Sequence, residues 1–156
     1  MDDASRALLR VDNLGYASNG QTLIEHVTFE LAAGPRTIVL GANGAGKSML
    51  LRLLHGLLQP VSGSVTWIAP GRESTQAMVF QRPVLLRRSA LANIHYALKL
   101  SRVAPGLRAA RAQEALRQSG LAEVAHRPAR VLSGGEQQRL ALARAWALGA
   151  RRAAAR

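Results

Sequence analysis

The chain has 156 residues, 48% of them hydrophobic, which suits one globular domain with a core and excludes an intrinsically disordered composition. It contains no cysteine, so disulfide bonds and thiolate metal sites are excluded. No apolar run approaches the roughly 18 residues of a membrane-spanning helix, and the N-terminal residues lack the pattern of a signal peptide, so we expect a cytoplasmic protein.

The net charge is +12, from 21 basic and 9 acidic residues. This balance is compatible with attraction to nucleic acid or anionic lipid, and equally with arginines spread over solvated faces. The arginines are scattered along the chain, and two residues each of Phe, Tyr and Trp offer no evident stacking platform. We therefore favour a solvated basic surface and predict that the protein does not bind nucleic acid.

Apolar segments predict three strands and a buried helix in the first half of the chain. Residues 22–31 alternate loosely between apolar and polar side chains, and residues 37–40 form a short apolar run typical of a parallel sheet covered on both faces. Residues 47–58 carry leucines on nearly every side, which predicts a helix buried all round. Residues 65–68 predict another strand, and residues 77–80 form a third apolar run.

The second half of the chain predicts mainly helices. Ser89 precedes residues 91–100 as a candidate N-cap, and residues 108–119 form a helix that Gly120 closes. A glycine-containing loop then leads into a helix over residues 136–148. The order of strands, glycine-rich loop and helices predicts an α/β fold with a helical insertion.

A glycine-rich loop between the predicted strand and the first helix has the spacing G-x-x-x-x-G-K-[ST]. Its glycines let successive backbone N–H groups point at one anion, and the following helix adds its positive end. The lysine of this motif reaches the β- and γ-phosphates, and the serine hydroxyl ligates Mg²⁺. The sequence therefore predicts a site for ATP and Mg²⁺ formed by Gly41, Asn43, Gly44, Ala45, Gly46, Lys47, Ser48 and Met49.

A second motif, Leu-Ser-Gly-Gly-Glu-Gln-Gln-Arg, occupies residues 132–139. Ser133 and the two glycines precede a helix and offer a hydroxyl, free N–H groups and a positive dipole end. Alone, the motif reads equally well as an ordinary helix start, because Ser133 and Glu136 have the spacing of a capping box. Together with the phosphate-binding loop upstream, it closely resembles the signature of the ATP-binding cassette (ABC) transporter family.

The resemblance to ABC cassettes covers nearly the whole chain and implies a P-loop NTPase core with an inserted helical subdomain. It implies a single nucleotide-binding domain, with a RecA-like core at residues 1–81 and a helical subdomain at residues 82–130. The signature and its helix follow at residues 131–148, and residues 149–156 form an atypical Ala/Arg tail. In this family two cassettes sandwich two ATP molecules, so the resemblance implies a homodimer.

The resemblance also assigns roles to further residues. Tyr16 occupies the place of the aromatic residue that stacks on adenine, with an ordinary core tyrosine as the alternative. Gln81 corresponds to the Q-loop glutamine, a catalytic residue that contacts Mg²⁺ and the attacking water. The signature residues that would contact the ATP of the second subunit are Ser133, Gly134, Gly135 and Glu136.

The compact form of the cassette resembles bacterial importers, most closely those of tungstate and other oxyanions. This resemblance implies docking of residues 82–130 on a transmembrane permease, an indirect role for a substrate-binding protein, and a peripheral position on the inner face of the cell membrane. Two alternatives stay open. One alternative to the importer subunit is an inactive nucleotide-binding remnant of such a subunit, and the other is a cassette protein that acts on nucleic acid.

The family pattern is not met after the signature helix. There the family has the Walker B motif, an apolar strand that ends in Asp-Glu and supplies the general base, followed later by a switch histidine. Residues 151–156 read Arg-Arg-Ala-Ala-Ala-Arg instead, and no carboxylate follows Glu136. We therefore expect a cassette truncated before Walker B, which is an ATPase by family but does not itself hydrolyse ATP.

Overall fold

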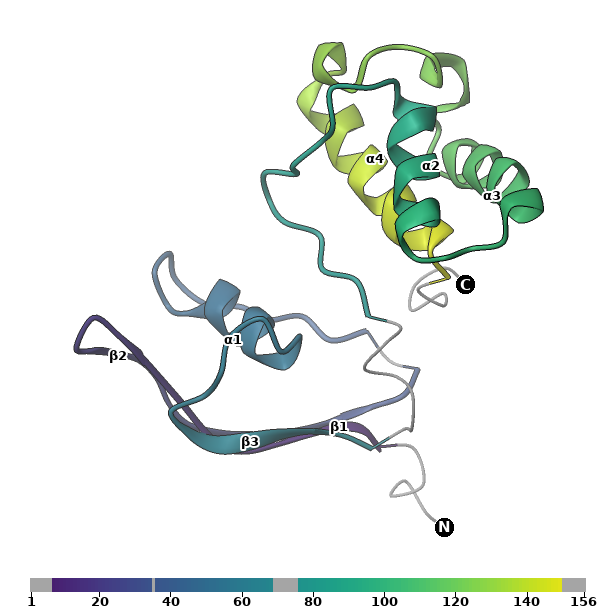
Figure 1. Ribbon diagram of the computed structural model, residues 1–156. Helices are drawn as coiled ribbons and strands as arrows, with labels where there is room; N and C mark the ends of the chain where they lie inside the picture. The colour runs from purple at the N-terminus through teal and green to yellow at the C-terminus, as the bar shows by residue number, and fades with distance from the viewer. Residues whose placement is uncertain (1–6, 35, 69–75, 150–156) are drawn as a thin grey trace. The chain divides into compact units, whose positions relative to one another are not determined.

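A computed structural model describes residues 7–34, 36–68 and 76–149 of the chain. The chain divides into two compact units, one extending to Gln76 and one beginning at Ala77 (Figure 1). The first unit contains the sheet and the phosphate-binding loop, and the second is helical and contains the signature. The predicted domain bounds at residues 81 and 130 remain predictions, and residues 150–156 of the tail lie outside the described part.

The first unit is built on a three-stranded antiparallel sheet in the order β2-β1-β3. The strands are β1 (Ala7–Ser18), β2 (Gln21–Ala32) and β3 (Ser62–Trp67). β1 and β2 form a hairpin whose two-residue turn, Asn19-Gly20, has positive φ angles of 52° and 75°. Asn-Gly is the strongest short-range signal for such a turn. The predictions for β2 and β3 are confirmed with small shifts of their ends, whereas β1 was not predicted.

The helix α1 (Lys47–Leu54) packs with this sheet around a small apolar core. That core consists of Leu9, Val11, Leu14, Ile24 and Leu53, which come from β1, β2 and α1. The indole N–H of Trp67 donates to the carbonyl of Leu54 at 3.3 Å, which ties β3 to the end of the helix. The sheet and helix thereby hold the two ends of the segment that leads into the phosphate-binding loop.

The helix prediction for residues 47–58 was wrong in length and in burial. α1 ends at Leu54, and Gly56 follows with a left-handed φ of 78°, which interrupts the helical path. Leu53 is its one buried residue, and Leu51 is exposed, as is Leu57 beyond the helix. A leucine-rich pattern all round predicts burial only where neighbours cover every side, and here the sheet covers one side.

The parallel strand predicted at residues 37–40 is also wrong, because this segment forms no ladder with any described residue. Ile38 and Leu40 are 77% and 86% exposed. The apolar run at residues 77–80 is likewise not a strand. An apolar extended segment becomes a strand only when another strand satisfies its backbone groups, and the described sheet is composed of other residues.

The described part of the second unit, residues 77–149, contains three helices and two short 3₁₀ turns. The helices are α2 (Ala90–Leu100), α3 (Pro105–Gln118) and α4 (Gly134–Ala147), and the turns are η3 (Ala122–Val124) and η4 (Ala129–Val131). The predicted α2 is confirmed, including its cap, because the Ser89 hydroxyl accepts the N–H of Ala92 at 3.2 Å. α3 begins three residues earlier than predicted, since proline suits the first helical position.

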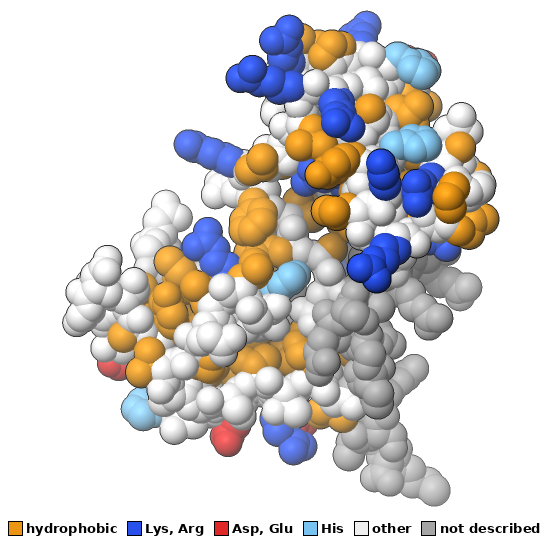
Figure 2. Space-filling view, in the orientation of Figure 1, with side chains coloured by type: hydrophobic (Ala, Val, Ile, Leu, Met, Phe, Trp, Pro, Cys, Tyr) orange, Lys and Arg blue, Asp and Glu red, His pale blue; other side chains and the backbone are white. Residues whose placement is uncertain are grey.

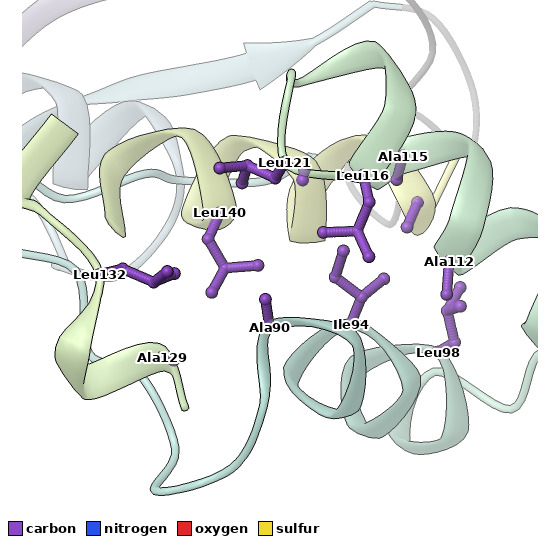
Figure 3. Packing of buried hydrophobic residues seen from close by; sticks show 12 residues of the cluster. Ala90, Ile94, Leu98, Ala112, Ala115, Leu116, Leu121, Ala129, Leu132 and Leu140 are labelled. Atoms are coloured by element: carbon purple, nitrogen blue, oxygen red, sulfur yellow. The ribbon is translucent and has the colours of Figure 1, made fainter. Parts of the chain in front are cut away.

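Residues from all three helices fill the core of the second unit (Figure 3). Ile94 and Leu98 of α2, Leu116 of α3 and Leu140 of α4 are completely buried, and Leu121 closes the cluster from the loop after α3. Burying each such side chain contributes about 1.5–3 kcal/mol relative to leaving it in water. This core fixes α4, and with it the signature at its N-terminus, against α2 and α3.

Candidate nucleotide-binding site

The phosphate-binding loop of the first unit, residues 41–48, is an exposed turn between an extended segment and α1. The N–H of Ala45 donates to the carbonyl of Ala42 at 3.2 Å, and the N–H of Gly46 donates to that of Gly44 at 2.8 Å. Gly44 and Gly46 have φ angles of 85° and 80°, in the left-handed region that favours glycine. The loop therefore curls tightly with its backbone accessible to a ligand.

Gly46 seats this loop directly against strand β2. A Cβ atom at this position would lie 2.9 Å from the carbonyl oxygen of Leu23 and 3.4 Å from Cγ1 of Ile24. No side chain fits at the first of these distances, and the left-handed φ disfavours one independently. The glycine of the motif is thus required by the approach of two backbone segments, which positions the loop on the sheet.

The side chain of Lys47 folds back over the loop. Its Nζ donates to the carbonyl oxygens of Gly41 at 2.8 Å and Ala42 at 2.6 Å. The first hydrogen bond of α1 runs from the N–H of Leu50 to the carbonyl of Gly46 at 2.8 Å. The three preceding N–H groups, those of residues 47–49, have no partner inside the helix and point out of its N-terminus. A lysine held by neutral carbonyls can exchange them for anionic oxygens at the same place.

The remaining loop residues differ in their surroundings. Ser48 is exposed, so its hydroxyl is accessible as a hard oxygen ligand of the kind that Mg²⁺ prefers. Met49 is partly buried and packs against the core of the first unit. The described residues contain no group of three His, Asp or Glu side chains arranged to hold a metal ion.

Tyr16 lies on β1, opposite Ile24 of β2 in the strand register. Ile24 is the residue whose side chain approaches Gly46, so Tyr16 is one strand away from the base of the loop. Its side chain is partly buried and packs against the apolar core of the first unit. The position is compatible with both interpretations made from the sequence, an adenine-stacking ring and a core tyrosine.

The signature is the N-terminus of α4, and its capping box is fully formed. The backbone N–H and the hydroxyl of Ser133 both donate to one carboxylate oxygen of Glu136, each at 2.7 Å. The N–H of Glu136 donates back to the Ser133 hydroxyl at 3.3 Å. Gly134 and Gly135 are the first exposed residues of the helix, not a loop as predicted. In this arrangement the carboxylate of Glu136 occupies the positive end of the helix.

The charge of Glu136 suits its place at the positive end of α4. Hydrogen bonds from the Ser133 hydroxyl and then from its backbone N–H lower the pKa of Glu136, and the positive charges of Arg139 and Arg127 lower it further. The carboxylate is therefore ionised at neutral pH. A phosphate that approached this helix end would meet a negative charge that already accepts the Ser133 hydroxyl, so Glu136 has to turn away first.

Two side chains of α4 join the signature helix to the segment that begins at Gln81. The amide of Gln138 donates to the carbonyl of Gln81 at 3.3 Å, and the guanidinium of Arg144 donates to the carbonyl of Val84 at 2.9 Å. Burial lowers the pKa of Arg144, without removing its charge near neutral pH. Neither contact was predicted from the sequence. Gln138 lies inside the signature and could have been considered, whereas the pairing of Arg144 with Val84 spans 60 residues and has no local signal.

The predicted site residues therefore form two sets. The first unit contains Tyr16, Ser48, Met49 and the glycines and lysine of the loop, and the second contains Gln81 and residues 133–136, with the carbonyl of Gln81 hydrogen-bonded to Gln138 of the signature helix. Each set is defined by contacts within its own unit. The side chain of Gln81 is exposed at the start of the second unit, and its carbonyl, not its carboxamide, contacts α4.

Comparison with known proteins agrees with these two motifs. The family model described as ABC transporter matches residues 24–152. The tungstate uptake system ATP-binding protein TupC of Peptoclostridium acidaminophilum is 37% identical over 145 residues, which are 90% of this chain and 67% of that protein. The cytochrome c biogenesis ATP-binding export protein CcmA of Cupriavidus pinatubonensis is 35% identical over 147 residues, 88% of this chain and 63% of that protein.

A solved structure confirms the fold. The structure of cbiO1 from Clostridium perfringens, part of the ABC transporter complex cbiONQ, superposes with a TM-score of 0.80 at 24% identity. The similarity covers 92% of this chain and 62% of that one. The chain thus belongs to the ABC transporter family, and it has the P-loop NTPase fold of the ATP-binding domain that was predicted from the sequence.

The chain spans about two thirds of the length of the two relatives, 63% of CcmA and 67% of TupC. Among the residues that the structure describes, no helix is both long and apolar enough to cross a bilayer.

Proposed function

We propose that this chain is the nucleotide-binding part of an ABC importer subunit, which couples binding and hydrolysis of ATP to the transport of a small solute. The observation that carries the proposal is the loop geometry, in which Lys47 Nζ rests on the carbonyls of Gly41 and Ala42 beside the open N-terminus of α1. A phosphate would find the lysine ammonium and several backbone N–H groups in one place.

The individual roles follow the chemistry of each group. Lys47 would bind the β- and γ-phosphates, the hydroxyl of Ser48 and the carboxamide of Gln81 would ligate Mg²⁺, and Tyr16 would stack on the adenine. Mg²⁺, when bound, neutralises charge on the phosphates. Ser133 and the N-terminus of α4 would serve the ATP held by a second cassette, so the proposal includes a homodimer.

We further propose the partners and location that an importer requires. The second unit, which contains the segment after Gln81, would dock on a transmembrane permease, and a substrate-binding protein would act on the permease from the other side. The subunit would then lie on the cytoplasmic face of the membrane.

An oxyanion is the cargo that we propose, because the tungstate uptake protein TupC is among the similar proteins. The export protein CcmA is similar to nearly the same degree, so the direction needs its own test. The uptake of radiolabelled tungstate, compared between cells with and without the gene, tests whether the transporter imports this oxyanion. Unchanged uptake would overturn the proposed cargo without touching the proposed nucleotide site.

Substitution of a lysine tests the nucleotide site itself. The chain contains only two lysines, Lys47 and Lys99, and Lys99 lies on α2 in the second unit, so Lys99→Ala is a matched control. Loss of charged hydrogen bonds predicts that Lys47→Ala binds Mg-ATP about 10- to 100-fold more weakly by isothermal titration. Equal affinities of the two variants would refute the assignment of the loop.

The inactive-remnant alternative makes a different prediction from the same protein. Such a remnant binds Mg-ATP through Lys47 but shows no turnover even when its permease partner is supplied. A Lys47-dependent phosphate release in that assembly would exclude the remnant. The nucleic-acid alternative predicts a gel shift that weakens steeply with salt.

A further inference from the structure

The positive charge of the protein is concentrated in one of its two units. Residues 77–149 contain twelve basic and three acidic side chains, a net charge of +9. The described residues of the first unit contain four basic and three acidic side chains, a net charge of +1. Figure 2 shows the lysine and arginine side chains spread over the visible face of the helical unit. Most of the arginines that are scattered along the sequence therefore belong to the helical unit.

Within the helical unit the charge is densest around α2. Residues 77–113 include seven basic side chains and no acidic one. The three carboxylates of the described unit come later. Glu114 pairs with Arg117 at 2.7 Å, Glu136 is bound to Ser133, and Glu123 lies on η3. Nothing acidic in the sequence of this segment offsets its positive charge.

Large apolar side chains are exposed within this basic segment. Leu100 ends α2 and is 72% exposed, and Leu107 lies in the first turn of α3 and is 51% exposed. Lys99 and Arg102, both exposed, flank Leu100 in the sequence. Tyr96 is exposed one turn before Leu100 and carries the guanidinium of Arg88 at 5.3 Å from its ring centre. We call Tyr96, Lys99, Leu100, Arg102 and Leu107 the turn surface.

This combination distinguishes between two anionic partners. A nucleic acid would use the arginines but gains little from exposed leucines, and it binds single strands through free aromatic faces. The ring of Tyr96 is already covered by Arg88. An anionic membrane uses both features, because cations bind its headgroups while exposed leucine side chains enter the interfacial region.

We propose that the turn surface binds anionic lipid headgroups directly. This inference goes beyond the proposed function, because it needs neither nucleotide nor permease. A subunit that attaches to a permease would gain from it a second, weaker contact with the same membrane, and two linked contacts strengthen each other through effective concentration. The contact also explains why the charge is concentrated in the unit proposed to face the permease.

The test uses the purified 156-residue chain and sedimentation with lipid vesicles. We expect binding to vesicles of phosphatidylcholine with about one third phosphatidylglycerol, no binding to phosphatidylcholine alone, and weakening as salt rises. Lys99→Gln combined with Arg102→Gln should weaken binding about 10- to 30-fold. Leu100→Ser combined with Leu107→Ser should weaken it about tenfold with the charge unchanged.

Matched controls make the proposal specific to the turn surface. Arg127→Gln combined with Arg130→Gln removes the same charge from exposed positions outside it, and Val131→Ser removes an exposed apolar side chain. Their effects should be at most a few-fold. Equal loss in the control pair, no effect of the leucine pair, or tighter binding to a DNA or RNA oligonucleotide than to anionic vesicles would overturn the proposal. Circular dichroism verifies that each variant retains its helices, which is expected because every substitution is on the surface.

Discussion

The buried amide of Asn93 holds the segment between Gln81 and α2 through hydrogen bonds, so we expect a measurable loss of stability when it is removed. The residue is completely buried in α2. Its Oδ1 accepts the N–H of Leu86 at 2.8 Å, and its Nδ2 lies 3.0–3.3 Å from the carbonyls of Leu86, Arg88 and Ser89. The amide therefore replaces, for this loop, the hydrogen bonds that a regular element would provide.

The loss of unfolding free energy in Asn93→Ala depends on which backbone groups keep a hydrogen-bond partner. The carbonyl of Arg88 still accepts the N–H of Ala129 at 2.8 Å, and that of Leu86 still accepts the N–H of Arg88 at 2.7 Å. The N–H of Leu86 loses its side-chain acceptor, which costs about 1–3 kcal/mol when water does not replace it. Together with the lost amide donors, we expect a fall in unfolding free energy of about 2–4 kcal/mol.

Urea unfolding followed by the helical signal measures the loss, and limited trypsin digestion at Arg87 and Arg88 reports the loop locally. Gln113→Ala, which removes an exposed amide from α3, is the matched control and should change stability by less than about 0.5 kcal/mol. A change of similar size in Asn93→Ala and in the control, without faster cleavage after Arg87 or Arg88, would refute the reasoning.

Two further predictions concern the candidate site. Tyr16→Ala should weaken the binding of ATP by about 1–3 kcal/mol and leave the binding of inorganic triphosphate unchanged, because a stacking ring acts on the base and not on the phosphates. Titration with both ligands checks this, and equal weakening of both would favour a core tyrosine. The capping box should make the helical unit sensitive to acid. The pKa of Glu136 is lowered in the folded state. Its contribution to the free energy of unfolding is therefore complete above the ordinary carboxyl pKa and is lost as the pH falls through the lowered, folded-state pKa. Glu136→Gln should therefore flatten the decline of stability in acid, measured by urea unfolding at several pH values, and an unchanged decline would contradict the assigned cause.

Local signals in the sequence predicted much of the helical unit. The cap at Ser89, the spacing of Ser133 and Glu136 and the glycine after α3 each act within a few residues, and Gly120 does adopt the left-handed φ of 67°. The glycine-lysine motif likewise predicted the loop and the start of α1 at Lys47. These features are determined by backbone chemistry that needs no distant partner.

Features that depend on distant partners were not predicted. The segment at residues 37–40 has the composition of a buried strand, but its state depends on residues elsewhere that would pair with it. The contacts from Gln138 and Arg144 to residues 81 and 84 join positions about 60 apart, which no periodicity encodes. The hairpin of β1 and β2 is the exception, because Asn19-Gly20 was a local signal available in the sequence and was overlooked.

The last prediction is that the 156-residue chain, purified by itself, binds Mg-ATP without hydrolysing it at a meaningful rate. Hydrolysis needs a base near the attacking water, and the polar residues of the second unit that are proposed to contact ATP or Mg²⁺ are poor bases. The carboxamide of Gln81 does not accept a proton, and the carboxylate of Glu136, the last in the sequence, accepts two hydrogen bonds from Ser133 that lower its pKa.

A missing general base lowers the rate by about 10²–10⁴. A phosphate-release assay measures turnover, and Lys47→Ala serves as the control for contaminating ATPases, because it removes the phosphate contact from the same preparation. Turnover that depends on Lys47 and proceeds at more than about one per second, within the ordinary range for enzymes, would show that another group in this chain activates the water. Glu136→Gln would then decide whether that group is the carboxylate of the capping box, released from Ser133 when ATP binds.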